Sequence, residues 1–364
     1  LDIGIDEETG KRKQKWFSGY RTRKDAERAM AQTINEINSG TFKEPSKEKV
    51  STYLKTWLKG RQDKLKPTTF TMYRRVIERY IIPSIGRLRL DQLNDIHLDR
   101  MYKKLSQRYS KSTVLGVHRV LKIALTRAAT SGFIKVNPAE IVEPPSKAKR
   151  SFTVWDEVEA AHFLQTAKSS RYYIAFLLAL YTGMRRGEIL GLRWKDIDFE
   201  RKTLSVLQTL SNDGKVFQDA KTGSSERSIA LQNHVIRELQ KHRQKVREER
   251  IKTGSDYENN DLVVCTRYGT KVLPQNLYRE WNKLKKRSEL PDIRFHDLRH
   301  THATLLLKQG VHPKIVSERL GHSSINITLD TYSHVLPGLQ EAAAASFEEM
   351  MSEAKAKTKN ALVE

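Results

Sequence analysis

Residues 294–335 carry the most informative pattern of the chain and read RFHDLRHTHATLLLKQGVHPKIVSERLGHSSINITLDTYSHV. His296 and Arg299 are three residues apart in a stretch with helical spacing, so we expect their side chains to point to the same side of one helix. A second helix, HPKIVSERLGHSS, is expected to end at Gly321 and His322, and Tyr332 follows ten residues later. The segment therefore predicts helices that bring two histidines, an arginine and a tyrosine together.

Two upstream stretches add cationic side chains. TGMRRGEILGL (182–192) places Arg185 at the start of a new helix, where backbone N–H groups and the helix dipole favour an anion. An arginine there could equally pair with Glu188, one turn further on. Strand patterns on either side of KTGSSER (221–227) predict a β-hairpin with Lys221 beside its tip, although a turn lysine is usually only exposed to solvent.

These residue types suit phosphoryl transfer with a tyrosine nucleophile and no metal. Two guanidinium groups can bind the nonbridging oxygens of a phosphate and stabilise the charge of the transition state. A phenol has a pKa of about 10, so a nearby histidine can help remove its proton. A lysine can protonate the departing 5′ oxygen.

A metal site is the alternative for the histidines, because His296 and His300 have i, i+4 spacing. The stretch HDLRH lacks the glutamate of an H-E-x-x-H motif, and an arginine lies between the two candidate ligands. We therefore predict no metal site and expect His300 and His302 to be buried hydrogen-bonding residues.

The blocks TGMRRGEILGL, HDLRHTHAT, LGHSS and DTYSH, in this order and spacing, resemble the tyrosine recombinase (phage integrase) family, in particular integrases of temperate phages and conjugative transposons. The resemblance extends over essentially the whole chain. It implies a site-specific recombinase that cleaves and rejoins DNA through a 3′-phosphotyrosine intermediate, without ATP, metal or other cofactor, and that integrates and excises a mobile element.

The resemblance also assigns roles to residues at matching positions. Arg185 and Arg299 would bind the scissile phosphate, and Arg185 is chosen over Arg186 because it occupies the fourth place of a T-G-x-R pattern. The other implied roles are as follows: Lys221 as general acid, His296 and His322 in proton transfer and phosphate binding, Tyr332 as nucleophile, and Glu188 as support for the first arginine.

Charge points independently to nucleic acid. The 364 residues include 66 Lys and Arg against 43 Asp and Glu, a net charge of +23, and such an excess binds polyphosphates. Residues 51–150 alone contain 22 basic and 7 acidic residues. We find no apolar run long enough to span a membrane and no secretory leader, so we expect a cytoplasmic protein that associates with the nucleoid when bound to DNA and that has no membrane partner. Cys265 is the only cysteine.

The basic middle segment reads as a bundle of amphipathic helices. Tyr53, Leu54, Trp57 and Leu58 share one face, and a later helix buries Val114, Val117, Leu121 and Leu125. The basic side chains outside these faces and in the proline-rich segment that follows are predicted to contact DNA. These predicted DNA-binding residues are Arg74, Arg75, Lys111, Arg119, Lys122, Lys147, Lys149 and Arg150.

The first fifty residues predict a strand with Trp16, Phe17 and Tyr20, followed by a helix that Thr22 caps with Asp25. We therefore expect an α+β multidomain fold that combines a small N-terminal sheet and helix, a helical (SAM-like) core-binding domain, and a mostly helical catalytic domain with a small antiparallel sheet. The expected divisions are 1–45 (arm-type DNA binding, with a few residues expected to precede Leu1), 46–140 (core binding), 141–152 (basic linker), 153–338 (catalysis) and 339–364 (helical tail for docking between protomers).

The expected partners are double-stranded core-type and arm-type attachment sites, a homotetramer on DNA, an excisionase and a host DNA-bending protein. Two other functions are also consistent with these sequence features. A DNA-binding regulator without catalysis would explain the charge, and a type IB topoisomerase-like enzyme would use the same chemistry to relax supercoils.

Overall fold

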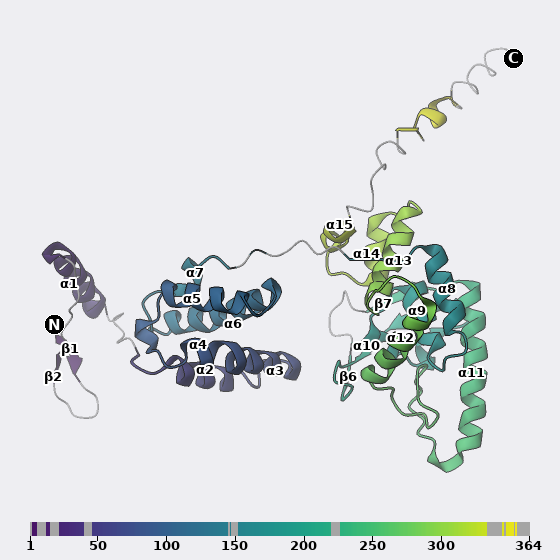
Figure 1. The fold of residues 1–364 in the computed structure, drawn as a ribbon, viewed down its shortest axis with the longest axis horizontal. Helices are drawn as coiled ribbons and strands as arrows, with labels where there is room; N and C mark the ends of the chain where they lie inside the picture. The colour runs from purple at the N-terminus through teal and green to yellow at the C-terminus, as the bar shows by residue number, and fades with distance from the viewer. Residues whose placement is uncertain are drawn as a thin grey trace. The chain divides into compact units, whose positions relative to one another are not determined.

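The computed structural model describes residues 2–5, 12–14, 22–39, 46–144, 146, 152–219, 226–332, 344–345, 347–352 and 354. The chain divides into two compact units, Leu1–Arg150 and Ser151–Glu364, and each is described by itself (Figure 1). Among the described residues, no helix is both long and apolar enough to cross a membrane.

The first unit begins with a small arm. Strands β1 (Asp2–Ile5) and β2 (Arg12–Gln14) pair antiparallel and precede helix α1 (Arg23–Asn38). The Oγ1 of Thr22 accepts a hydrogen bond from the backbone N–H of Asp25 at 3.2 Å, which confirms the predicted cap. Residues Trp16, Phe17 and Tyr20 lie outside the described part of the chain.

The rest of the first unit is a bundle of short helices. Its elements are α2 (Val50–Lys59), α3 (Pro67–Val76), the π-helical turn η1 (Ile77–Ile81), α4 (Ile82–Ile85), η2 (Leu90–Gln92), α5 (Asp95–Ser106), α6 (Lys111–Thr130) and α7 (Pro138–Ile141). The predicted faces of α2 and α6 are buried, with Leu54, Leu121 and Leu125 fully enclosed. The hydroxyl of Tyr53 on α2 donates to the carbonyl of Ala124 on α6 at 2.8 Å. Helical periodicity therefore predicted this core correctly.

The second unit is mostly helical and contains two small sheets. Its helices are α8 (Glu157–Ala167), α9 (Tyr173–Thr182), α10 (Arg186–Gly191), η3 (Trp194–Asp196), α11 (Asn233–Thr253), η4 (Gly254–Asp256), α12 (Pro274–Ser288), α13 (Asp297–Lys308), α14 (Pro313–Leu320) and α15 (Ile325–Tyr332). Its strands are β3 (Ile197–Asp198), β4 (Thr203–Val206), β5 (Gln208–Leu210), β6 (Phe217–Asp219) and β7 (Arg227–Ala230).

Helix α9 forms the centre of the second unit and packs against α8, α11 and α13 (Figure 1). Every residue from Ile174 to Ala179 is at most 1% exposed, as expected for a helix that is apolar on all sides. An aromatic cluster from neighbouring elements fills the space beside it, and Trp281 of α12 lies 4.9 Å from Phe163 of α8 between ring centroids. This core holds the helices that carry the predicted site.

The strand pairing differs from the predicted hairpin. Strand β6 pairs with β5, and β7 pairs with β4 in the order β3-β4-β7, so the described strands on either side of 220–225 do not pair with each other. The hairpin turn lies earlier, at Asp213 and Gly214, where glycine adopts the left-handed conformation with φ of 71°. The hairpin prediction at Lys221 was wrong, because the chain reverses before β6 and β7 pairs with the more distant β4 instead of with β6.

Candidate active site

The second unit contains a pocket of about 380 Å³ between the start of α10, helix α13, the end of α14 and helix α15. Five of the predicted catalytic residues line it: Arg185, His296, Arg299, His322 and Tyr332. The sixth, Lys221, falls in the segment 220–225, outside the described residues. The pocket therefore gathers residues that are up to 147 positions apart in the sequence.

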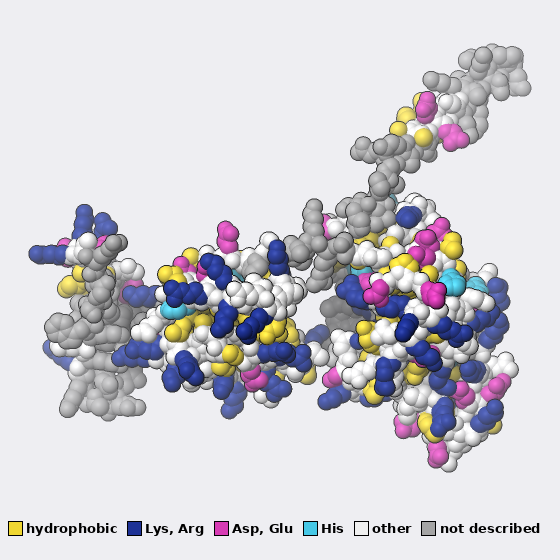
Figure 2. Space-filling view, in the orientation of Figure 1, with side chains coloured by type: hydrophobic (Ala, Val, Ile, Leu, Met, Phe, Trp, Pro, Cys, Tyr) yellow, Lys and Arg dark blue, Asp and Glu magenta, His cyan; other side chains and the backbone are white. Residues whose placement is uncertain are grey.

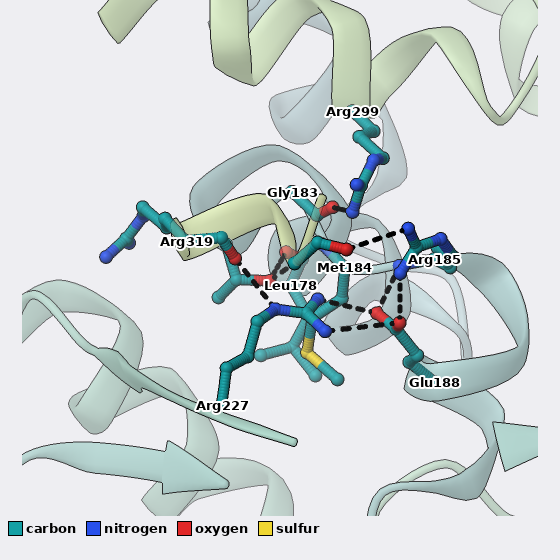
Figure 3. Close-up of polar contacts among 10 residues, drawn as sticks. Leu178, Gly183, Met184, Arg185, Glu188, Arg227, Arg299 and Arg319 are labelled. Atoms are coloured by element: carbon teal, nitrogen blue, oxygen red, sulfur yellow. Dashed lines mark hydrogen bonds and ion pairs between the residues drawn. The ribbon is translucent and has the colours of Figure 1, made fainter. Parts of the chain in front are cut away.

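Arg185 is held at the mouth of this pocket by Glu188. Its Nη1 donates to Oε1 of Glu188 at 2.8 Å, its backbone N–H donates to Oε2 at 2.8 Å, and its Nη2 donates to the carbonyl of Gly321 at 3.2 Å (Figure 3). The Arg185 side chain is still 41% exposed, so part of the guanidinium faces solvent. Arg185 therefore pairs with Glu188 and also lines the pocket, so the ion pair and the anion site suggested by the sequence are compatible.

Arg227 on β7 is a further arginine at the site that the sequence analysis did not single out. Its Nη2 donates to Oε2 of Glu188 at 2.7 Å, its Nη1 to Oε1 at 3.2 Å and its Nε to the carbonyl of Arg319 at 2.8 Å (Figure 3). Burial would raise the pKa of Glu188, but the adjacent guanidinium groups of Arg227 and Arg185 outweigh it and hold this pKa below its usual value. Glu188 is therefore a buried carboxylate shared by two arginines.

Arg299 is the most buried cation of the pocket, with only 3% of its surface exposed. Its Nη1 donates to the carbonyl of Gly183 at 2.8 Å, whereas its buried Nη2 has no partner among the described residues (Figure 3). Burial, reinforced by the positive charge of Arg185, lowers the pKa of Arg299 far below its usual value, to about 9. An unpaired guanidinium nitrogen in a pocket is a donor available to an anion.

Gly183 sets the geometry between these arginines. It ends α9 in the left-handed conformation with φ of 66°, which turns the chain toward α10. A Cβ at this position would lie 2.6 Å from Cδ2 of Leu320 and 2.8 Å from Cδ2 of His302. Only glycine therefore fits the turn that places Arg185 beside Arg299.

The two predicted histidines occupy different environments. His322, directly after α14, has its Nδ1 2.8 Å from Oγ1 of Thr328, and burial together with the charge of Arg299 lowers its pKa to about 4. His296 lies directly before α13, where its side chain makes no capping hydrogen bond and is exposed. Loss of solvent around the ring, and then the charge of Arg299, also lower the pKa of His296. The His322 imidazole is thus neutral at pH 7 when no anion is present, and the same influences favour the neutral form of His296.

Tyr332, the last residue of α15, is 1% exposed, and its hydroxyl lies 2.7 Å from Nδ1 of His300. Burial raises the pKa of the Tyr332 phenol, with Arg299 acting in the opposite direction. The His300 ring also stacks on Phe152, with ring centroids 4.3 Å apart and planes 19° apart. The sequence predicted a hydrogen-bonding role for His300 but missed its partner, because 32 residues separate the two side chains.

His302 confirms the prediction of a buried hydrogen-bonding residue. Its Nδ1 lies 2.8 Å from the carbonyl of Leu180, and Nε of Arg319 donates to its Nε2 at 3.1 Å. Since a carbonyl only accepts and a guanidinium only donates, the ring proton resides on Nδ1. Across the described residues, no three His, Cys, Asp or Glu side chains are grouped in a way that could hold a metal ion.

The predicted DNA-binding residues of the first unit are on its surface. Arg74 and Arg75 are exposed at the end of α3, and Lys111, Arg119 and Lys122 are exposed along α6. Figure 2 shows many Lys and Arg side chains and fewer acidic ones on the visible face of this unit. The linker residues Lys147, Lys149 and Arg150 lie outside the described residues.

Comparison with known proteins identifies the family. A model of the phage integrase family matches residues 153–338, a model of the phage integrase N-terminal SAM-like domain matches 49–106, and an arm DNA-binding domain model matches 2–37. A protein of Caldanaerobacter subterraneus subsp. tengcongensis named tyrosine recombinase XerC-like is 34% identical over 360 residues, covering 93% of this chain and 92% of that protein.

The chain belongs to the phage integrase family of tyrosine recombinases.

Other integrases are also similar to this chain. The ICEBs1 integrase of Bacillus subtilis is 24% identical and covers 91% of each chain. Among solved structures, the Tn1549 transposon integrase with transposon right end DNA has a TM-score of 0.70 at 21% identity, covering 84% of this chain and all of that one. A lambda integrase tetramer bound to a Holliday junction has a TM-score of 0.63 at 21% identity, covering 90% of each chain. The expected three-part fold is confirmed, and the chain is a site-specific recombinase acting on DNA.

Proposed function

We propose that this recombinase cleaves and rejoins DNA strands through a 3′-phosphotyrosine formed by Tyr332, and that it thereby integrates and excises a mobile element. The observation that carries the proposal is the pocket itself. Tyr332 lines the same cavity as Arg185 and Arg299, and Arg299 presents a buried guanidinium nitrogen without a partner. A phosphodiester supplies the missing acceptor and lies within reach of a nucleophile.

Each cationic group has a distinct role in this proposal. Arg185 and Arg299 bind the nonbridging oxygens of the scissile phosphate, and Glu188 keeps Arg185 in place. Lys221 protonates the departing 5′ oxygen. His296 and His322 contribute to phosphate binding and proton transfer, since a bound dianionic transition state would raise their lowered pKa values toward neutrality.

The energetics require neither ATP nor a metal. One phosphodiester is exchanged for a phosphotyrosine and then for another phosphodiester, so the bond energy is conserved. Positioned cations supply the charge stabilisation that a metal gives in other phosphoryl transfer enzymes.

The domain roles follow the matched family models. We assign 1–45 to arm-type sites, 46–140 to core-type sites, 141–152 to a basic linker and 153–338 to catalysis, in keeping with the models that match 2–37, 49–106 and 153–338. The basic residues proposed to contact DNA phosphates are Arg74, Arg75, Lys111, Arg119, Lys122, Lys147, Lys149 and Arg150.

Assembly is proposed to be a homotetramer on DNA, with an excisionase and a host DNA-bending protein as accessory partners. The tail, 339–364, would dock on a neighbouring protomer. Described residues of this tail are helical and leave Phe347 and Met350 60% and 55% exposed, which suits a segment that buries its apolar side chains elsewhere. Deleting residues 340–364 should then loosen tetramer assembly and deregulate cleavage, and unchanged assembly and cleavage would contradict this role.

The test of catalysis uses DNA selected by the protein itself. Duplexes bound by the Tyr332→Phe variant are enriched from a random library, nicked near the centre, and incubated with the wild-type chain. A covalent protein–DNA adduct that Tyr332→Phe abolishes is expected. No adduct would favour a DNA-binding regulator, and relaxation of plasmids without strand exchange would favour a topoisomerase-like enzyme.

A further inference from the structure

His300 lines the pocket and contacts the proposed nucleophile. Its Nδ1 lies 2.7 Å from the hydroxyl oxygen of Tyr332, and both side chains line the pocket that contains Arg185 and Arg299. We propose that His300 is the base that accepts the phenolic proton of Tyr332 during strand cleavage. This inference rests on the proposed function, because it requires Tyr332 to be the nucleophile.

The surroundings of His300 fix its ring for this task. Phe152 stacks on one face of the imidazole, with centroids 4.3 Å apart, and meets the Tyr332 ring edge to face at 5.7 Å. His296, one helical turn earlier, approaches at 5.3 Å in a perpendicular arrangement. These contacts hold the imidazole between three rings with Nδ1 directed at the hydroxyl, so the proton acceptor needs little reorganisation.

The other histidines of the pocket are placed less favourably for this step. Nδ1 of His322 is 2.8 Å from the hydroxyl of Thr328, and His296 makes no hydrogen bond to Tyr332 within the described part of the chain. Of the described side chains, the imidazole of His300 is the one within hydrogen-bonding distance of the Tyr332 hydroxyl. Geometry therefore selects His300 before any consideration of acidity.

Electrostatics leave the His300 ring in the form that accepts a proton. Burial, followed by the influence of His296, lowers the pKa of His300 to about 4, so the imidazole is neutral at pH 7. The charged and titratable groups that face it are His296, Asp297, Arg299 and Arg294 from α13 and the residues before it, His322 from the turn after α14, and Tyr332 from α15. A negatively charged phosphate between the arginines would raise the pKa of His300 and so favour proton uptake as the reaction proceeds.

The proposed step balances in both directions. As the oxygen of Tyr332 forms its bond to phosphorus, its proton passes to Nδ1 of His300, and the bond from phosphorus to the 5′ oxygen breaks with its electron pair on that oxygen. Lys221, in its proposed role, donates the proton that completes the 5′ hydroxyl. In rejoining, the 5′ hydroxyl returns its proton to Lys221 as its oxygen bonds to phosphorus. The bond from phosphorus to the tyrosine oxygen breaks, and His300 gives its proton back to that oxygen.

The experiment measures single-turnover cleavage of the nicked duplex by full-length His300→Asn and His300→Ala variants. Asparagine keeps a hydrogen-bond acceptor near the position of Nδ1 but cannot take up a proton. Both variants should cleave about 10²–10⁴-fold more slowly than the wild type. The matched control is His162→Ala, which removes an exposed histidine on α8 and should cleave at the wild-type rate.

A second comparison separates proton transfer from positioning. A fluorinated tyrosine with a more acidic phenol is incorporated at position 332, alone and together with His300→Asn. Because an acidic phenol needs less help from a base, the deficit caused by His300→Asn should shrink at least tenfold. A merely structural role would leave that deficit unchanged.

The outcomes decide between the alternatives. Cleavage by His300→Asn at the wild-type rate or faster would overturn the proposal and indicate that His300 only holds Tyr332 in the absence of DNA. A deficit that the fluorinated tyrosine does not reduce would also overturn it. If the proposed function itself were wrong, the wild-type chain would form no adduct that depends on Tyr332. If only the role of His300 were wrong, the wild type would still form this adduct.

Discussion

Replacing Arg299 with methionine should stabilise the DNA-free catalytic unit while it abolishes strand cleavage. Arg299 is only 3% exposed, and one of its guanidinium nitrogens is buried without a partner among the described residues. Keeping a charge under these conditions costs free energy, which Glu188 offsets in part and a bound phosphate would offset further. Methionine retains an apolar side chain of similar length without the charge.

The expected magnitude follows from the acidity of Arg299. Its pKa is lowered from the usual value of an arginine to about 9, and this difference corresponds to roughly 5 kcal/mol of destabilisation when the group is charged in both the folded and unfolded states at pH 7. The substitution also leaves the buried carbonyl of Gly183 without its donor, at a cost of about 1–3 kcal/mol. The net prediction is a gain of about 2–4 kcal/mol in the free energy of unfolding.

The assay follows amide hydrogen exchange of α9 and α13 in the full-length chain as urea is raised, because the two units need not unfold together. Lys308→Met is the matched control, since it removes an exposed cation from the same helix and should change the stability by less than about 0.5 kcal/mol. Selected DNA should stabilise the wild type more than the Arg299→Met variant. A loss of stability of 1 kcal/mol or more in Arg299→Met would refute the reasoning, because it would show that the guanidinium is satisfied without DNA.

Three further predictions concern the groups around the pocket. Arg227→Met should lower the free energy of unfolding of the catalytic unit by about 3–5 kcal/mol and slow cleavage, because it leaves Glu188 buried with only one arginine. A denaturation midpoint equal to that of the wild type would show that Glu188 does not depend on Arg227. Gly187→Ala should lower the free energy of unfolding, measured by thermal denaturation, by about 1–3 kcal/mol, because its Cβ would lie 2.6 Å from a backbone carbonyl oxygen of β5. The control, Gly116→Ala in the open middle of α6, should not lower it. Stability should fall between pH 7.5 and pH 5, because the unfolded chain takes up protons at histidines whose pKa is lowered in the folded state. For His322, with a folded pKa of about 4 against 6.5, the loss is at most about 2 kcal/mol, because solvent screens the half-buried ring, and the His322→Asn variant should show a flatter pH profile in denaturant titrations.

Local patterns in the sequence predicted most of the helical framework. The cap at Thr22 and the buried faces that include Leu54 and Leu121 depend only on neighbouring residues and helical spacing, and the structure shows both. The π-helical turn at Ile77–Ile81 was not predicted, because nothing in an apolar helical pattern distinguishes it. Strand pairing around Lys221 was predicted wrongly, since pairing partners are set by contacts between distant segments.

The sequence predicted most of the residues of the candidate site, but it did not predict which of them contact one another. The motifs named Arg185, Arg299 and Tyr332, and these residues line one pocket. Arg227 was missed because an arginine after a polar turn looks like any exposed cation, and only the fold shows that it is buried against a carboxylate. His300 was placed in the interior without its partner, because the contact with the tyrosine depends on the packing of α13 against the end of α15.

The most direct test of the central claim is to identify the protein atom that becomes bonded to DNA. The wild-type chain is incubated with the nicked selected duplex, digested with protease and nuclease, and the nucleotide-linked peptide is sequenced by mass spectrometry. The account predicts a 3′-linked nucleotide on Tyr332 and no linked peptide from the Tyr332→Phe variant. A nucleotide attached to another residue, or through its 5′ end, would contradict it.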